Sequence, residues 1–175
     1  MFVSDKTTIF SDKKTNDVQL ITLHWTVGQP SQVFDNDYHF QILGSGQIYQ
    51  DDRAFDSAGN FVPLAHAWHH NTANLGISVC GMLGAQEPIL WTPKDLYTFP
   101  SSYGQYAPTQ MQMDAMCELV AAAVKHYGLT FDKIKTHYDL ALEDGYPGER
   151  WEWKFEKPLI LQRVQQVYNS EETPR

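Results

Sequence analysis

The segment at residues 18–27 constrains the fold more than any other part of this chain. Its sequence is VQLITLHWTV, an apolar and partly β-branched run that is typical of a central strand in a sheet. One side chain that can bind a metal, His24, lies between Leu23 and Trp25. Because successive side chains of a strand point to opposite faces, His24 is expected on the face opposite its two neighbours.

Strand and helix patterns alternate along the rest of the chain. Further strands are predicted at residues 38–43, 47–50, 75–82 and 134–137. A long helix is predicted to begin after Thr109, which forms a capping box with Gln112, and to end at Gly128. A second helix is predicted from Pro158 to about Tyr168. The alternation predicts an α/β fold with a single mixed central sheet and helices packed on it.

The domain organisation is predicted to be simple. Residues 1–17 are polar and are expected to form a loosely packed lead-in, residues 18–170 the folded domain, and residues 171–175 a frayed tail. Residues 84–108 are rich in Pro, Tyr, Ser and Gly, and we expect a long loop there. Cys80 and Cys117 are expected to be free core thiols, with a disulfide between them as the alternative.

Charge and hydropathy narrow the possible partners. The formal net charge is −8, and no cluster of Lys and Arg interrupts it. Nucleic acids and anionic membranes both need a basic patch, so neither is an expected partner. No segment approaches membrane-spanning length, and the N-terminus lacks the apolar core of a signal peptide. We therefore expect synthesis in the cytoplasm, with another route to any external substrate, while the oligomeric state stays open.

Three potential metal ligands stand apart from the structural pattern. His24 lies in the strand at 18–27, His137 at the end of the strand at 134–137, and Glu152 just beyond a DGYPG turn. Two imidazoles and one carboxylate leave a fourth coordination position open, as hydrolytic zinc requires. Taken singly, each histidine is more often a core residue. Arg150 and Glu152, two residues apart, are equally compatible with a surface ion pair.

Five segments, in the same order, resemble the zinc-dependent N-acetylmuramoyl-L-alanine amidases, a group that includes amidase-type phage lysozymes and peptidoglycan recognition proteins. The segments are ITLHWTVG, DYHFQILGSGQIYQ, AHAWHHNTANLGISVCG, PTQMQMDAMCEL and THYDLALEDGYPGERWEW, within about residues 18–155. The resemblance implies that family's fold, with residues 18–170 as the catalytic domain, a Zn²⁺ cofactor and peptidoglycan as substrate. It also implies that His24, His137 and Glu152 hold the zinc.

The third ligand departs from the family pattern. Family members carry Lys or Arg, any residue, and then Asp or Cys, whereas this chain has Arg150, Trp151 and Glu152. The extra methylene of glutamate moves its carboxylate by more than about 1 Å unless the backbone adjusts. Sets of two histidines and one glutamate are known in zinc hydrolases, so Glu152 is kept as the predicted ligand. Asp144, on the same loop, is the alternative.

Four further residues take roles from the resemblance. Tyr38 corresponds to the tyrosine beside the attacking water, and Arg150 to the cation that neutralises the developing oxyanion. His66 and Asn71 lie in the groove-lining segment and are expected to contact substrate. Some amidases have an acidic general base where this chain has Ser78, so it resembles the branch that uses tyrosine and a cation. The histidines at 69 and 70 are expected to be exposed loop residues.

These features predict hydrolysis of the amide between N-acetylmuramic acid and the L-alanine of the stem peptide, in a phage endolysin or an antibacterial effector. Two alternatives stay open. The same fold can bind peptidoglycan without cleaving it, and such a binder is expected to purify without stoichiometric zinc. A cytoplasmic amidase that trims recycled wall fragments is expected to prefer soluble fragments over intact wall.

Overall fold

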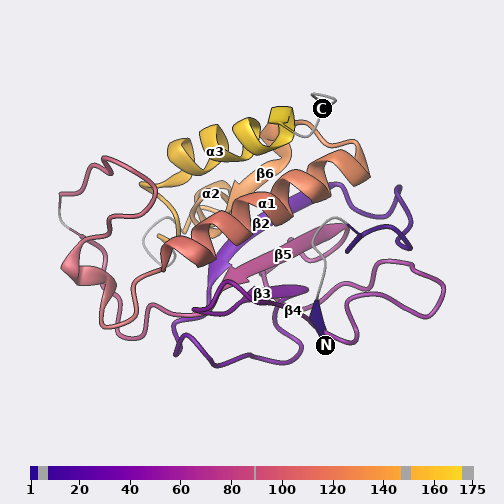
Figure 1. Cartoon of the computed structure of the whole chain (residues 1–175), viewed down its shortest axis with the longest axis horizontal. Helices are drawn as coiled ribbons and strands as arrows, with labels where there is room; N and C mark the ends of the chain where they lie inside the picture. The colour runs from indigo at the N-terminus through magenta and orange to yellow at the C-terminus, as the bar shows by residue number, and fades with distance from the viewer. Residues whose placement is uncertain (4–7, 89, 147–150, 171–175) are drawn as a thin grey trace.

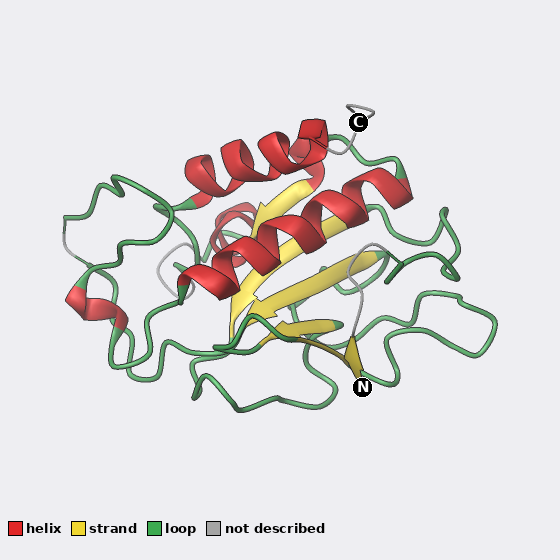
Figure 2. Ribbon diagram, in the orientation of Figure 1, coloured by secondary structure: helices red, strands yellow, loops and turns green. Residues whose placement is uncertain are grey.

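The computed structural model describes residues 1–3, 8–88, 90–146 and 151–170, and a six-stranded mixed sheet lies at its centre (Figures 1 and 2). The strand order is β1-β4-β3-β5-β2-β6. Strand β2 (Leu20–Trp25) lies between β5 (Asn74–Val79) and β6 (Ile134–Thr136), and both are parallel to it. Strand β3 (Phe40–Ile42) is parallel to β5, whereas β4 (Ile48–Gln50) and β1 (Phe2–Val3) are added antiparallel at one edge. The predicted mixed sheet is confirmed.

Two long helices, α1 (Gln110–Tyr127) and α3 (Lys157–Ser170), pack side by side over one face of the sheet (Figure 1). Helix α1 begins as predicted, because Thr109 and Gln112 exchange the two hydrogen bonds of a capping box. It ends at Gly128, whose φ of 64° is the left-handed conformation that glycine accommodates easily. A short helix, α2 (His137–Glu143), follows β6 directly, and single 3₁₀ turns occupy Ser101–Tyr103 and Phe131–Lys133.

The two faces of β2 differ in polarity: one belongs to the hydrophobic core and the other carries polar side chains. Ile21, Leu23 and Trp25 belong to the buried core that includes α1 and α3. Thr22 and His24 alternate with them and therefore point to the opposite face, although both are also fully buried. Strand β5 repeats this division, with Leu75, Ile77 and Val79 in the core and Asn74, Gly76 and Ser78 on the polar face. Since paired residues of parallel neighbours share a face, His24 lies beside the residue at 78.

The N-terminal segment packs more closely than its polar composition predicts. Phe2 and Val3 pair with β4, and the side chains of Ile9 and Phe10 are buried in the core. The Phe10 ring packs edge-on against Phe40. Burial of a large apolar side chain stabilises a fold by about 1.5–3 kcal/mol, so Ile9 and Phe10 contribute to the stability of the fold. The predicted tail at 171–175 lies outside the described residues.

Both cysteines are free and buried, as predicted. Burial raises the pKa of the Cys80 thiol and of the Cys117 thiol to about 12. Neither thiol is therefore ionised at neutral pH, and both serve as small apolar core residues.

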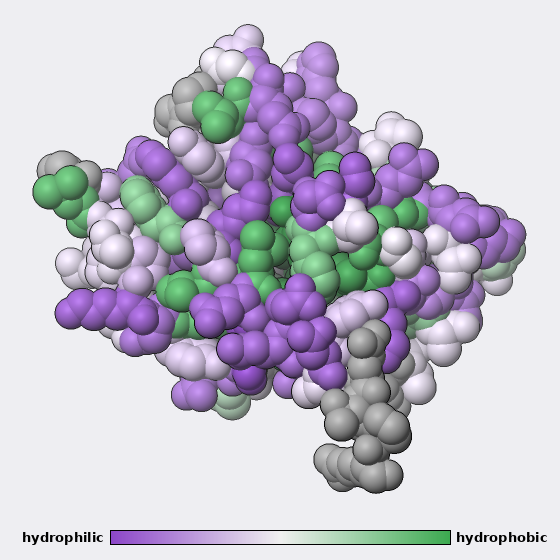
Figure 3. All heavy atoms as spheres, turned by 90° about the horizontal axis from the view of Figure 1, so that it is seen from above, coloured by the Kyte–Doolittle hydropathy of each residue, from purple (hydrophilic) through white to green (hydrophobic). Residues whose placement is uncertain are grey.

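Within the described residues, no helix combines the length and the apolar character needed to cross a bilayer. The face seen from above in Figure 3 is largely hydrophilic, with a smaller apolar area among the polar side chains.

The long loop between β5 and α1 is held against the start of α3 by a buried carboxyl group. Glu156 Oε1 accepts hydrogen bonds from the Trp91 indole, at 3.1 Å, and from the Tyr103 hydroxyl. The Tyr103 ring also packs against Trp25 and Trp151. The predicted loop therefore borders the segment that carries Glu152.

Glu156→Gln is expected to raise the melting temperature at pH 7. Burial raises the pKa of Glu156 despite the hydrogen bonds from Tyr103 and Trp91, so the folded state binds this proton more tightly than the unfolded chain. Stability is therefore lost as pH rises above the ordinary glutamate pKa of 4.5. Glutamine cannot ionise, so its advantage should shrink below that pH. Thermal melts at pH 7 and pH 4, with Glu143→Gln as an exposed control, measure the difference. A lower melting temperature for Glu156→Gln at pH 7 would contradict this account.

Candidate metal centre and groove

His24, His137 and Glu152 converge in space although 113 residues separate the two histidines. The Nδ1 atoms of the two histidines are 3.1 Å apart. Glu152 places Oε2 at 3.3 Å from His24 Nδ1 and Oε1 at 3.3 Å from His137 Nδ1. Among the described residues, this is the one group of three metal-binding side chains whose ligand atoms all lie within 4.8 Å of one another.

Strand pairing brings the two histidines together. His24 lies near the end of β2, and β6 runs parallel beside it, so the residue that follows β6 reaches the same end of the sheet. That residue is His137, the first of α2. A capping box between Thr136 and Asp139 fixes the start of this helix, and Lys157 donates a 2.7 Å hydrogen bond to Asp139. The orientation of His137 is therefore set by the turn from strand to helix.

Aromatic packing positions Glu152. Its neighbours Trp151 and Trp153 both pack edge-on against Trp25, and the Trp25 amide lies 3.4 Å from Glu152 Oε2. Residues 152–156 form turns that lead into α3. Trp153 has a φ of 58°, a strained conformation for a bulky residue, directly beside the candidate ligand. Arg150 lies outside the described residues.

The two histidines stabilise the ionised form of Glu152. Burial acts to raise the pKa of Glu152, but hydrogen bonds and charge interactions with His137 and His24 outweigh it and lower the pKa to about 2. The carboxylate is therefore charged at neutral pH. A buried anion needs a cationic partner, and this one faces two imidazole nitrogens that can bind either a proton or a metal ion.

The geometry of the three side chains fits a zinc ion. A tetrahedral site with metal–ligand bonds of about 2.0 Å has ligand atoms about 3.3 Å apart. Here the Nδ1 atoms of His24 and His137 are 3.1 Å apart, and each lies 3.3 Å from a different oxygen of Glu152. One ligand atom from each of the three residues lies within 4.8 Å of the others. Two imidazoles and one carboxylate are also a known donor set of catalytic zinc, and they leave one corner free. The residues present therefore fit the metal that the sequence resemblance implied.

His66 lies against His24 and has both ring nitrogens occupied. Its Nδ1 is 3.1 Å from His24 Nε2, and its Nε2 is 2.8 Å from the carbonyl oxygen of Asn74. Burial, with added effects of His24 and His39, keeps the pKa of His66 well below its ordinary value, so the ring is neutral. The contact of His66 with substrate stays a prediction, and both ring nitrogens already have partners within the protein. Sequence reasoning missed its contact with His24.

Gly76 is a sequence signal for the close packing of the His66 ring against strand β5. A Cβ atom there would lie only 2.6 Å from His66 Cγ, closer than side chains tolerate. A glycine inside a strand often marks such a close approach.

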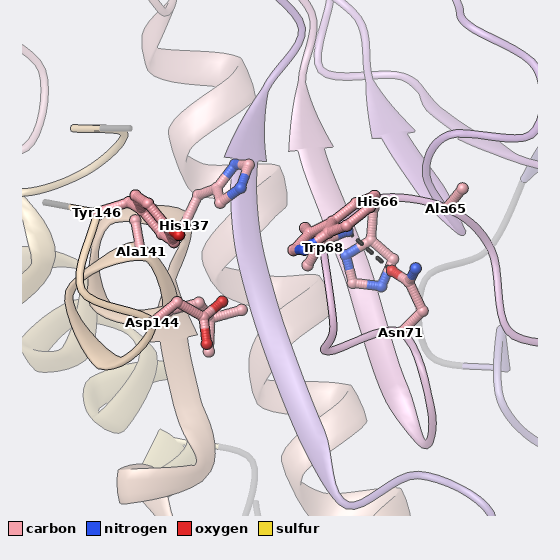
Figure 4. A pocket seen from close by; sticks show the side chains of 10 residues that line it. Ala65, His66, Trp68, Asn71, His137, Ala141, Asp144 and Tyr146 are labelled. Atoms are coloured by element: carbon pink, nitrogen blue, oxygen red, sulfur yellow. Dashed lines mark hydrogen bonds between the residues drawn. The ribbon is translucent and has the colours of Figure 1, made fainter. Parts of the chain in front are cut away.

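An open groove of about 520 Å³ leads to His137 and His66. Figure 4 shows its two walls, one from α2 and the residues after it, and the other from the loop before β5. Each wall carries an exposed aromatic side chain, Tyr146 with 60% of its surface exposed and Trp68 with 79%. Asn71 lies on the second wall, where its side-chain oxygen accepts a 2.8 Å hydrogen bond from the Ala67 amide.

The other predicted residues occupy defined positions. The Tyr38 ring centroid is 5.2 Å from that of His24, and Tyr38 precedes β3 instead of lying within the predicted strand.

Asp144, the alternative ligand, is 3.1 Å from His70 Nε2 and does not belong to the group of three. His70 is therefore half-buried and hydrogen-bonded, whereas His69 is exposed as expected. Ser78 is buried beside His24, and its hydroxyl has no hydrogen-bond partner among the described residues.

Fold and site together define an α/β domain with a buried His-His-Glu group at an open groove. The sequence profile of the N-acetylmuramoyl-L-alanine amidases matches residues 14–150. The chain belongs to the N-acetylmuramoyl-L-alanine amidase family, and the resemblance noted in its sequence is confirmed. No curated protein matches it.

Several solved structures are similar to this chain at low sequence identity, and those with TM-scores of 0.50 or more share its fold. The Ph2119 endolysin from a Thermus scotoductus bacteriophage is 16% identical, with a TM-score of 0.53 over 87% of this chain and 88% of that one. A variant of PlyL is 11% identical, with a TM-score of 0.50 over 93% and 94% of the two chains. The Drosophila peptidoglycan recognition protein SA is 15% identical, with a TM-score of 0.46 over 71% and 70%.

Proposed function

We propose that this chain is a zinc-dependent amidase that cleaves the bond between N-acetylmuramic acid and the L-alanine of the stem peptide. The observation that carries the proposal is the convergence of His24, His137 and Glu152, which each offer one zinc-binding atom within 4.8 Å of the others. Membership of the N-acetylmuramoyl-L-alanine amidase family supports the choice of the bond that is cleaved. The endolysin among the similar folds supports a lytic role on bacterial cell wall.

The protein side chains have separable tasks in the proposed reaction. His24, His137 and Glu152 hold Zn²⁺, which when bound would polarise the amide carbonyl and acidify a water molecule. Tyr38, whose ring packs against His24, orients the attacking water and passes a proton to the leaving amine. By its resemblance to the family cation, Arg150 is assigned the role of neutralising the oxyanion that develops on the substrate, a contribution of roughly 3–4 kcal/mol. Its guanidinium stays protonated at any working pH, so it cannot act as the base.

A direct assay tests the proposed reaction. Purified peptidoglycan incubated with the protein and zinc should release L-alanine amino termini without new reducing sugar ends. Reducing ends in place of amino termini would overturn the choice of bond. A protein that binds peptidoglycan but purifies without zinc and releases neither product would be the non-catalytic binder. Faster cleavage of soluble muropeptides than of intact sacculi would favour a role in recycling wall fragments.

Tyr38→Phe is expected to lower kcat by about 100-fold while zinc stays bound, because it removes a proton-transferring hydroxyl and keeps the ring that packs on His24. Steady-state kinetics on a soluble muropeptide and metal analysis of the same preparation measure the two effects. Unchanged kcat would remove Tyr38 from the reaction. Loss of zinc would show that its role is structural.

Trp68→Ala is expected to raise KM roughly 2- to 10-fold with little change in kcat, because an aromatic contact is worth about 0.5–1.5 kcal/mol. Trp68 is 79% exposed on the groove wall, where it can pack against a sugar ring or a peptide. Met111→Ala, an exposed apolar position on α1 that does not line the groove, is the control. Equal kinetics for the two variants would exclude this wall from substrate binding.

A further inference from the structure

A chain of three hydrogen-bonding groups runs from the backbone to the candidate ligand atom of His24. The Asn74 carbonyl oxygen lies 2.8 Å from His66 Nε2, and His66 Nδ1 lies 3.1 Å from His24 Nε2. The other nitrogen of that ring, His24 Nδ1, is the atom that faces His137 and Glu152. The chain therefore ends at the proposed metal position.

The chemistry of the groups decides where each proton lies. A carbonyl oxygen can only accept, so His66 Nε2 carries the hydrogen and donates it to Asn74. A neutral imidazole has one N–H, so His66 Nδ1 holds a lone pair and must accept. His24 Nε2 is then the donor in the second bond. Nε2 keeps this hydrogen when a metal ion binds, so Nδ1 is the nitrogen whose lone pair is offered to the metal. Without a metal, Nδ1 can share a proton with Glu152, which lies 3.3 Å away.

The surrounding structure holds the His66 ring in this orientation. Its face lies on Gly76, where a side chain would collide with the ring. The side chain of Asn74 is itself fixed, because it accepts a 2.9 Å hydrogen bond from Thr22 and donates one of 2.6 Å to the carbonyl of His70. His39 packs edge-on against His66 at 5.3 Å and accepts the Gly76 N–H. The ring therefore cannot turn without breaking several contacts.

We propose that His66 is a positioning residue that keeps the hydrogen of His24 on Nε2, so that Nδ1 is the nitrogen that binds the metal. The proposal rests on the proposed function, because it takes His24 as a zinc ligand. In this role His66 acts through His24 and does not need to contact the substrate.

The tautomer can be measured without metal or substrate. Long-range ¹H–¹⁵N correlation spectra of the metal-free wild-type protein report which nitrogen of each imidazole carries hydrogen. Hydrogen on Nε2 of both His24 and His66 is expected. Absence of hydrogen from Nε2 of His24 would overturn the proposal, whereas a proton shared between Nδ1 and Glu152 would not. If the expected tautomers are found but the wild type binds no zinc, the proposed function fails and the tautomer assignment stands.

Two isosteric variants separate the two hydrogen bonds of His66. In His66→Asn the amide oxygen takes the place of Nδ1 and can still accept from His24. In His66→Gln the amide nitrogen takes the place of Nε2 and can donate only to Asn74. The Asn variant should keep the His24 tautomer and most of the zinc affinity, whereas the Gln variant should lose about 10- to 100-fold in affinity.

Calorimetric titration with Zn²⁺, together with the imidazole spectra of each variant, gives the result. Thermal melts of the metal-free variants show whether both are folded. Equal losses of affinity with an unchanged His24 tautomer would mean that His66 supports the fold only and would overturn the positioning role. If neither variant folds, the wild-type spectra still decide the tautomer.

Discussion

Glu152→Ala is expected to lose stoichiometric zinc, whereas Asp144→Ala is expected to retain it. Outer residues around a metal typically change its affinity by 10- to 100-fold, so loss of a direct ligand should exceed roughly 100-fold. The structure places the Glu152 oxygens 3.3 Å from both histidine nitrogens, while Asp144 pairs with His70. The variants therefore test the two carboxylates that the sequence offered as the third ligand.

Metal content after dialysis, measured by mass spectrometry, and the zinc dissociation constant from competition with a chelator give the two readouts. Glu152→Gln is the control for size, because it keeps the volume of the buried side chain and removes the charge. It should also lose zinc, since a neutral amide is a weak ligand. Retention of zinc by Glu152→Ala together with its loss from Asp144→Ala would transfer the ligand role to Asp144.

The sheet was predictable because its signal is local. Alternation in β2 places Ile21 and Leu23 on one face and His24 on the other, and a period of two residues is sufficient to read this from sequence. The capping box at Thr109 similarly marked the start of α1. Helix α2 was missed although Thr136 and Asp139 form the same type of cap, because the segment was interpreted as a strand end followed by a turn.

The candidate site was predictable only in part, because strand order is a long-range property. The pairing of β6 with β2 brings His137 to His24, but no local sequence pattern predicts which strands pair. The resemblance to a family supplied that information for the ligands. It did not supply the contact between His66 and His24, since that depends on the close approach of an imidazole to Gly76.

Gly76→Ala is expected to damage the metal site without changing any side chain that touches metal or substrate. The added Cβ would lie 2.6 Å from His66 Cγ and 2.8 Å from His66 Nδ1, so the buried ring must move. Overpacking of this kind typically costs about 1–3 kcal/mol of stability. Because His66 Nδ1 is the atom that faces His24, the displacement should also weaken zinc binding, by about 10- to 100-fold.

Gly44→Ala provides a matched control, because its Cβ would lie 2.7 Å from Pro30 Cβ, a similar collision that involves none of the histidines. Both variants should unfold at lower denaturant concentration than the wild type. Only Gly76→Ala should also bind zinc more weakly when measured under conditions where each variant is fully folded. Equal zinc affinities in the two would mean that the position of the His66 ring does not influence His24, and that the stability loss at position 76 is a packing effect alone.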